Sequence, residues 1–323
     1  MLGRPKKQES AVDANSLKDV GMNMTRNDHG NDARQVSRRK MLRVATGSGA
    51  AVMASGVKSP GRERPGGAGR IKQSIAYWCV QKYWDIEKTC QVARELGCRS
   101  VELVEPKDWP TLKKYGLVCA IANSHWFDNG MNNPQYHEMC LGKLREAIAA
   151  CGDAGFPNVI TFTGLAEGIG PEEGIKNCVA GYKKIMSYAE KQKVSLCLEV
   201  LNSRVAVDMV GVPGYQGDHT DYCMKIVQQV GAPRMKLLFD IFHVQIMDGD
   251  LIARIRQYKD YIGHYHTAGN PGRRELDDQQ EINYRPIMEE IARTGYTGYV
   301  GHEFIPTRDP LEGLKQAVAL CDV

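Results

Sequence analysis

Short apolar runs alternate with longer helical patterns from residue 71 to the end of this 323-residue chain. The runs are continuous rather than broken by a polar residue at every second position, which is typical of parallel strands covered on both faces. Glycines follow several helical patterns, where they favour the left-handed cap that precedes the next strand. Eight strand–helix units in about 250 residues predict a (β/α)8 TIM barrel, an α/β fold. The expected strands are 75–80, 100–104, 117–123, 158–163, 195–201, 236–242, 262–267 and 298–304, and the expected helices are 86–97, 110–115, 134–154, 171–191, 219–230, 250–260, 284–294 and 310–320.

A doubly wound open sheet is the alternative fold for such an alternation. Sheets of that kind that bind nucleotides carry a glycine-rich turn for the phosphates. Here no GxGxxG follows an expected strand and no GxxxxGK[ST] occurs in the chain. The barrel is therefore preferred, and in a barrel the chemistry lies at the C-terminal ends of the strands and in the loops that follow them.

The N-terminal segment has a different character. Residues 1–36 are polar and lack apolar periodicity, which predicts disorder. Arg38 and Arg39 then precede a short, weakly apolar stretch at 44–54, and this order resembles a twin-arginine export signal. We therefore expect the twin-arginine machinery to export the protein to the periplasm or another extracytoplasmic compartment. If the arginine pair is incidental, a cytoplasmic location follows.

A linker is predicted between the two parts of the chain. Residues 55–70 are rich in Ser, Gly, Pro and Arg, so we expect a disordered leader at 1–70 and a TIM-barrel domain at 71–323. The two parts also differ in charge. The leader contains 14 Lys and Arg against 6 Asp and Glu, whereas the remainder contains 28 against 32. A mildly acidic body argues against nucleic-acid binding.

The apolar runs do not indicate a membrane protein, and the cysteines do not indicate a zinc finger. No run of eighteen apolar residues occurs, so stable membrane insertion is not expected. The ten cysteines form no CxxC and no Cys/His cluster with zinc-finger spacing. They are expected to be small, buried core residues.

Ionisable residues stand near the C-terminal ends of four consecutive expected strands. A carboxylate inside an apolar strand is costly unless it is paired or bound to a metal, so four such positions at one level predict a shared site. Two glutamates, an aspartate and a histidine form a hard, oxygen-rich set, which suits one divalent ion such as Mn²⁺, Mg²⁺ or Co²⁺ better than structural Zn²⁺. The ionisable residues at these strand ends are Glu199, Asp240, His243, His264, His266, His302 and Glu303.

The region from Glu199 to Glu303 resembles the xylose-isomerase-like barrel superfamily of sugar isomerases and epimerases. The likeness is carried by Leu-Glu-x-Leu-Asn, Phe-Asp-x-x-His, Gly-His-x-His and Gly-x-Glu-Phe. Within the superfamily, the C-terminal part looks most like hydroxypyruvate isomerase. The segments that follow that family's order are Pro213-Gly214-Tyr215-Gln216, Pro271-Gly272-Arg273-Arg274-Glu275, Glu281-Ile282-Asn283-Tyr284 and the run from Gly295 to Pro306.

The resemblance implies a role for each residue of the expected site. Glu199, Asp240, His266 and Glu303 would bind the metal, and Glu199 and Glu303 would also be the two proton-transfer groups. His243 would hold a substrate oxygen.

Other assignments are less direct. Arg273 would contact the substrate, although Arg274 could serve equally. His264 faces the same side of its strand as His266, so it is expected to support the ligands without binding the metal. His302 should point away from the site by strand alternation. The roles of Glu102, Glu105 and His125-Trp126 stay open.

The resulting hypothesis is a metal-dependent isomerase that acts on a small hydroxycarbonyl compound through an enediolate. Hydroxypyruvate would be converted into 2-hydroxy-3-oxopropanoate (tartronate semialdehyde). A ketose 3-epimerase is the alternative, because the same residues could return the proton to the opposite face of the same carbon. A non-catalytic sugar-binding protein and a metal-dependent phosphodiesterase are weaker alternatives. A homo-oligomer is compatible with the sequence.

Overall fold

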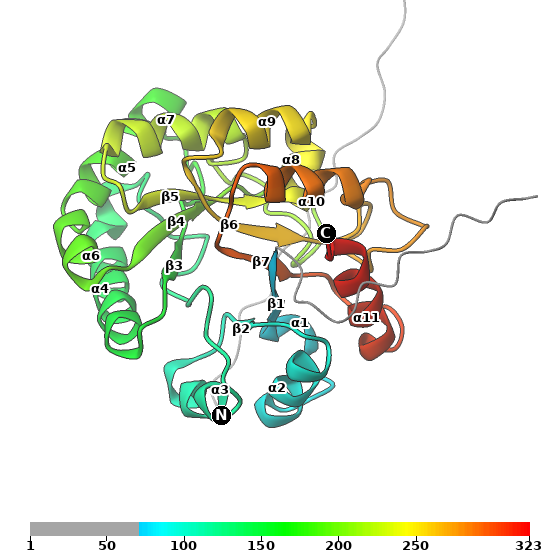
Figure 1. The fold of residues 1–323 in the computed structure, drawn as a ribbon. Coiled ribbons are helices and arrows are strands. Elements are labelled where there is room, and N and C mark those ends of the chain that lie inside the picture. The colour runs from blue at the N-terminus through cyan, green and yellow to red at the C-terminus, as the bar shows by residue number, and fades with distance from the viewer. Residues whose placement is uncertain (1–70) are drawn as a thin grey trace, which may run out of the picture. The chain divides into compact units, whose positions relative to one another are not determined.

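The computed structural model describes residues 71–323, and the expectations for the leader at 1–70 lie outside this range. Seven parallel strands form one sheet in the order β2-β1-β7-β6-β5-β4-β3. Figure 1 shows the sheet curled at the centre with helices along its outside. The strands are β1 (Lys72–Ala76), β2 (Ser100–Glu102), β3 (Asn158–Thr161), β4 (Ser195–Glu199), β5 (Met235–Asp240), β6 (Ile262–Thr267) and β7 (Tyr299–His302).

The expected strand at 117–123 is present as an irregular segment between β2 and β3. Val118 bridges to β2, and Ala122 bridges to β3, both in parallel. Between these bridges the Ser100 hydroxyl accepts from the Ala120 N–H at 2.9 Å, and the Asn158 amide donates to the Ala120 carbonyl at 2.9 Å. Side chains thus replace the backbone hydrogen bonds between strands at Ala120, and the regular strand is interrupted there. The segment still links the two ends of the sheet.

The helices follow the expected alternation, with one division. Residues 171–191, expected as one helix, form two helices that are separated at Lys184 and Ile185. The helices are α1 (Tyr77–Val80), α2 (Ile86–Glu95), α3 (Trp109–Lys114), α4 (His137–Ala154), α5 (Pro171–Lys183), α6 (Met186–Gln192), α7 (Thr220–Val230), α8 (Ile241–Met247), α9 (Leu251–Tyr258), α10 (Tyr284–Arg293) and α11 (Pro310–Cys321).

Two expected strands end earlier than their apolar runs do. The run 75–80 leaves β1 at Ala76 and enters α1, and the run 236–242 leaves β5 at Asp240 and enters α8. Asp240 Oδ1 caps α8 by accepting from the N–H groups of Phe242 and His243 at 2.8 and 3.2 Å. His243 therefore lies in the first turn of a helix rather than at the end of a strand.

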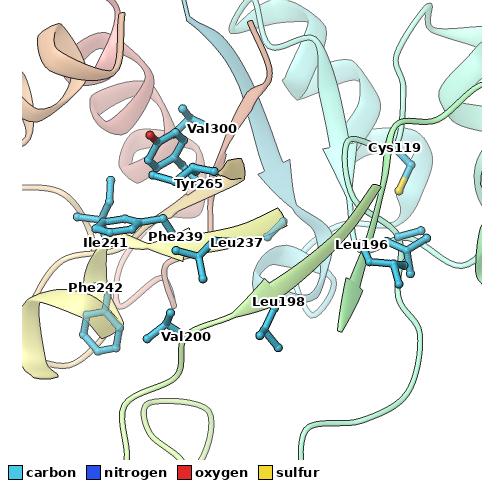
Figure 2. Close-up of a cluster of buried hydrophobic side chains, with 14 of the residues drawn as sticks. Cys119, Leu196, Leu198, Val200, Leu237, Phe239, Ile241, Phe242, Tyr265 and Val300 are labelled. Atoms are coloured by element: carbon cyan, nitrogen blue, oxygen red, sulfur yellow. The ribbon is translucent and has the colours of Figure 1, made fainter. Parts of the chain in front are cut away.

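Alternate residues of β3, β4 and β5 face two separate apolar clusters. Leu196 and Leu198 of β4 pack in the larger cluster between sheet and helices, together with Leu237 and Phe239 of β5 (Figure 2). Cys197 of β4 belongs to a smaller cluster on the opposite face, inside the curled sheet. Since side chains alternate along a strand, Glu199 faces the same interior as Cys197.

Within 71–323, no helix is both long and apolar enough to cross a membrane. All ten cysteines lie in this part of the chain, where they are buried and unpaired, as expected for core residues.

Candidate active site

Four expected metal ligands meet at the C-terminal ends of four neighbouring strands. Glu199 ends β4, Asp240 ends β5, His266 lies near the end of β6, and Glu303 directly follows β7. Their ligand atoms all lie within 4.8 Å of one another, and all four residues are buried. His266 is central: its Nδ1 lies 2.8 Å from Glu303 Oε2, 3.4 Å from Glu199 Oε1 and 4.0 Å from Asp240 Oδ2.

Three carboxylates in one buried space repel one another. Burial raises the pKa of Glu199 to about 7, and the neighbouring charge of Glu303 adds to the rise. Burial likewise raises the pKa of Asp240 to about 6, although Arg273 opposes the shift. For Glu303 burial is outweighed, because Arg273 and His266 hold the pKa of this carboxyl well below its usual range. The cluster therefore needs positive charge before all three carboxylates can ionise.

A divalent cation fits this donor set. Three carboxylates and the Arg273 guanidinium leave two negative charges when His266 is neutral, which one divalent ion would balance. The oxygen-rich ligands with a single imidazole suit Mn²⁺, Mg²⁺ or Co²⁺. Glu199, Asp240, His266 and Glu303 are the residues that could hold it.

Arg273, rather than Arg274, lies in the site. Its side chain is buried, whereas Arg274 is exposed. Nη2 donates to Glu303 Oε2 at 2.5 Å and lies 3.7 Å from Asp240 Oδ2, while Nη1 donates to the carbonyl of Met209 at 2.7 Å. The guanidinium is thus fixed against the carboxylates at the edge of the cluster.

Trp78 is a site residue that sequence reasoning missed. Its Nε1–H donates to Glu303 Oε1 at 2.7 Å, and its ring faces the Arg273 guanidinium at 5.1 Å. The sequence placed Trp78 inside an expected strand, where an apolar run gave it no individual signal. Because α1 begins at Tyr77, the indole is brought over the site instead.

His243 presents one ring nitrogen to the site in a defined protonation state. Its Nδ1 accepts from the backbone N–H of Asn202 at 3.1 Å and lies 2.7 Å from Asn202 Nδ2. Burial lowers the pKa of His243 well below its usual value, so the ring is neutral and its proton is on Nε2. Asn202 was visible in the motif Leu-Glu-x-Leu-Asn, but nothing in that pattern indicated this contact.

A cavity of about 360 Å³ opens beside the cluster. Glu199, His243, Arg273 and Glu303 are among its lining residues. The other lining residues are mainly apolar, with a few polar side chains. They include Trp78, Gln81, Leu103, Asn123, Ser124, His125, Phe127, Ile160, Phe162, Leu201, Met209 and Val212.

His125 and Trp126, which both line the cavity, differ in burial and in their contacts. His125 is buried, and its Nε2 contacts Thr161 Oγ1 at 2.8 Å while its Nδ1 contacts the Asn129 carbonyl at 3.1 Å. Both nitrogens are therefore occupied by the protein. Trp126 is 59% exposed and stacks on Phe127 at the cavity.

The remaining ionisable residues, Glu102, Glu105 and His302, differ in burial and in their partners. Glu102 is buried with Oε1 at 2.9 Å from His266 Nε2 and 3.2 Å from His264 Nε2. Although burial opposes it, these two histidines lower the pKa of Glu102 to about 2. His302 points away from the site as expected, with Nε2 at 2.7 Å from Gln73 Oε1. Glu105 is exposed.

Comparison with known proteins identifies the family of the chain. A family model described as a xylose isomerase-like TIM barrel matches residues 90–322, which confirms the expected fold and resemblance. The human protein named putative hydroxypyruvate isomerase is 38% identical over 250 residues, covering 76% of this chain and 86% of that protein. The hydroxypyruvate isomerase of Escherichia coli strain K12 is 33% identical over 209 residues, covering 64% and 73% of the two chains.

A solved structure shares the fold at lower identity. The crystal structure of AP endonuclease, family 2, from Brucella melitensis matches with a TM-score of 0.65 and 22% identity, covering 76% of this chain and 96% of that one. At this identity the likeness concerns the fold alone.

Proposed function

Because the chain belongs to the xylose isomerase-like TIM-barrel family, we propose that it is a divalent-metal-dependent isomerase of a small hydroxycarbonyl compound. Hydroxypyruvate is the proposed substrate and 2-hydroxy-3-oxopropanoate the product. The name of the human relative, at 38% identity, supports the reaction class. The observation that carries the proposal is that Glu199 and Glu303 line one cavity while both belong to the same buried ligand cluster.

The reaction moves a carbonyl between two adjacent carbons. A proton leaves C3 of hydroxypyruvate and a proton is added to C2, while the hydroxyl proton passes from O3 to O2, so the product has the same atoms. When bound, the divalent cation would supply Lewis-acid polarisation of the carbonyl and stabilise the developing negative charge. The protein must supply a base, an acid and fixed hydrogen-bond donors.

Glu199 and Glu303 are the proposed proton-transfer pair, and their contacts differ. Both oxygens of Glu303 accept hydrogen bonds, from Trp78 Nε1 and Arg273 Nη2. Glu199 Oε1 has a single side-chain contact, at 3.4 Å from His266 Nδ1. Glu199 is thus the freer base for removing the C3 proton, and Glu303 would act from the other side of the substrate.

His243 and Arg273 orient the substrate in this proposal. The Nε2–H of His243 would donate to the oxygen that gains charge, which suits a neutral ring whose Nδ1 is already satisfied. Arg273 is the one Lys or Arg side chain among the cavity-lining residues, so it would contact the substrate carboxylate.

A ketose 3-epimerase remains a second candidate because of the cavity size. At about 360 Å³, the cavity falls in the range of sites that enclose ligands much larger than a three-carbon acid. This volume leaves room for the additional carbons of a ketose.

A panel assay tests the proposal. Purified protein would be incubated with Mn²⁺ and with hydroxypyruvate or fructose-type ketoses, and the products separated by chromatography. Formation of 2-hydroxy-3-oxopropanoate supports the isomerase, and a C3 epimer of a ketose supports the alternative. Absence of turnover with every substrate would contradict both functions.

A further inference from the structure

Glu102 is a buried carboxylate that the proposed reaction does not use. It ends β2, on the far side of β1 and β7 from the strand that carries His266. Its side chain nevertheless reaches the His266 ring, with Oε1 at 2.9 Å from Nε2. Glu102, His264 and His266 are each 0% exposed. A carboxylate placed there at such a desolvation cost requires a specific partner.

We propose that Glu102 is a positioning residue that fixes the tautomer and orientation of His266 for metal binding. The inference rests on the proposed metal site. An imidazole bound to a metal through one nitrogen commonly donates its other N–H to a carboxylate, which sets the tautomer and strengthens the ligand. Glu102 lies at the Nε2 side of the ring, and the three other ligands lie at the Nδ1 side.

The two ring nitrogens therefore have separate tasks. An ionised carboxylate only accepts hydrogen bonds, so Nε2 must carry the proton in the contact with Glu102. Nδ1 lies 2.8 Å from Glu303 Oε2 and 3.4 Å from Glu199 Oε1, so this nitrogen also carries a proton while no cation is bound. A bound cation would take the place of the Nδ1 proton, and Glu102 would keep the remaining proton on Nε2, so that the Nδ1 lone pair faces the cluster.

The backbone of β7 leaves space for the Glu102 side chain to reach His266. Gly301 of β7 pairs with His266 of β6, and a Cβ at Gly301 would clash with Glu102 Oε1. The glycine of the Gly-x-Glu-Phe motif therefore keeps the path open two residues before Glu303.

His264 holds the carboxylate from a second direction. Its Nε2 lies 3.2 Å from the same Oε1 that contacts His266. Both histidines project from β6 to the same side because they are two residues apart. The carboxylate is consequently held against β6 rather than left to rotate toward β1.

A merely stabilising ion pair is the competing explanation, and metal affinity separates the two. The test variant is Glu102→Gln, and the matched control is Glu290→Gln. Glu290 is also buried, but it lies on α10 and pairs with Arg256 and Arg293. We expect Mn²⁺ affinity, measured by calorimetric titration, to fall about 10–100-fold in Glu102→Gln. The control should unfold at a lower temperature and bind Mn²⁺ as the parent does.

The absorption spectrum of bound Co²⁺ provides a second measurement. This spectrum would stay unchanged if Glu102 only stabilised the fold. Reorientation of His266 should change the Co²⁺ spectrum of Glu102→Gln but not that of Glu290→Gln. Equal Mn²⁺ affinity and an unchanged Co²⁺ spectrum in a folded Glu102→Gln would overturn the proposal. If the parent itself bound no divalent ion, the metal-dependent function would fail, and the role of Glu102 with it.

A measurement on the unaltered protein keeps the proposal testable if Glu102→Gln does not fold. The Mg²⁺-loaded full chain, labelled with ¹⁵N-histidine, would be studied by NMR, with His266 assigned by comparison with His266→Gln. We expect the His266 proton on Nε2. A proton on Nδ1 would overturn the proposal.

Discussion

The backbone N–H of Asn202, in the loop after β4, donates over 3.1 Å to Nδ1 of His243, in the first turn of α8. Because a backbone N–H can only donate, this contact fixes which nitrogen of the neutral ring carries the proton. The loop after one strand thereby determines how the helix after the next strand presents a hydrogen-bond donor to the cavity.

His243 is predicted to act through its Nε2–H. His243→Phe removes this donor while keeping an aromatic ring in a buried position, so we expect kcat to fall about 10²–10³-fold, as for loss of a donor to a developing negative charge. His243→Gln, which retains an N–H group, should lose less. Steady-state kinetics and circular dichroism would check this, and equal activity of His243→Phe and the parent would remove His243 from the mechanism.

Glu303 is predicted to do more than bind metal. Glu303→Gln keeps an oxygen that can coordinate but cannot accept a proton at neutral pH, so we expect turnover to fall at least ~10²-fold. Asp240→Asn should mainly weaken metal binding, so added Mn²⁺ should recover part of its loss. If excess Mn²⁺ brought Glu303→Gln close to the parent rate, Glu303 would be a ligand only and the proton-transfer pair would be abandoned.

The main features of the fold could be predicted because each one corresponds to a strong pattern in the sequence. Continuous apolar runs indicated parallel strands, and strand ends at one level indicated that Glu199, Asp240, His266 and Glu303 would meet. The exact strand ends could not be predicted, since an apolar run continues unchanged from β1 into α1 and from β5 into α8. The cap formed by Asp240 marks the start of α8, whereas α1 begins after Ala76 with no side-chain cap.

Residues that act through long-range contacts were harder to recognise. Trp78 and Glu102 lie more than 160 positions from the site residues they contact. Nothing in the local pattern of an apolar strand distinguishes a core tryptophan from one that donates to Glu303. Arg273 and Arg274 are adjacent and chemically identical, so the choice between them required the backbone path of the loop.

Metal removal provides a test that does not depend on the substrate. Chelator treatment should abolish activity, and Mn²⁺, Co²⁺ or Mg²⁺ should restore it. Metal should also raise the unfolding temperature, because a ligand at 100 times its Kd stabilises the native state by about 2.7 kcal/mol. Thermal melts of stripped and reloaded protein would measure this. Full activity of stripped protein would contradict the proposed metal dependence.

The leader is predicted to direct export. Residues 1–70 fused to a reporter should reach the extracytoplasmic side by the twin-arginine route. Replacing both Arg38 and Arg39 by lysine should block it, since this pair identifies the signal. Cell fractionation would report the outcome. Transport that ignored the double substitution would exclude this route.

Arg273 and Arg274 form a natural matched pair for the last prediction. Arg273 is buried against Glu303, whereas Arg274 is exposed. We expect Arg273→Gln to raise the KM for hydroxypyruvate about 10–100-fold, corresponding to about 1.5–3 kcal/mol for a hydrogen bond to a charged group. Arg274→Gln should leave KM unchanged, and Arg273→Lys should retain part of the binding because it keeps the charge.

A substrate without a carboxylate separates the two tasks of Arg273. Dihydroxyacetone has the same hydroxycarbonyl group, and its proton removal can be followed by deuterium exchange in NMR. If Arg273 binds the substrate carboxylate, Arg273→Gln should impair hydroxypyruvate far more than dihydroxyacetone. If Arg273 serves only to hold Glu303 in place, both should decline equally, since each needs the same carboxylate. Equal loss would therefore assign Arg273 to Glu303 and leave the substrate carboxylate without a Lys or Arg partner among the described residues that line the cavity.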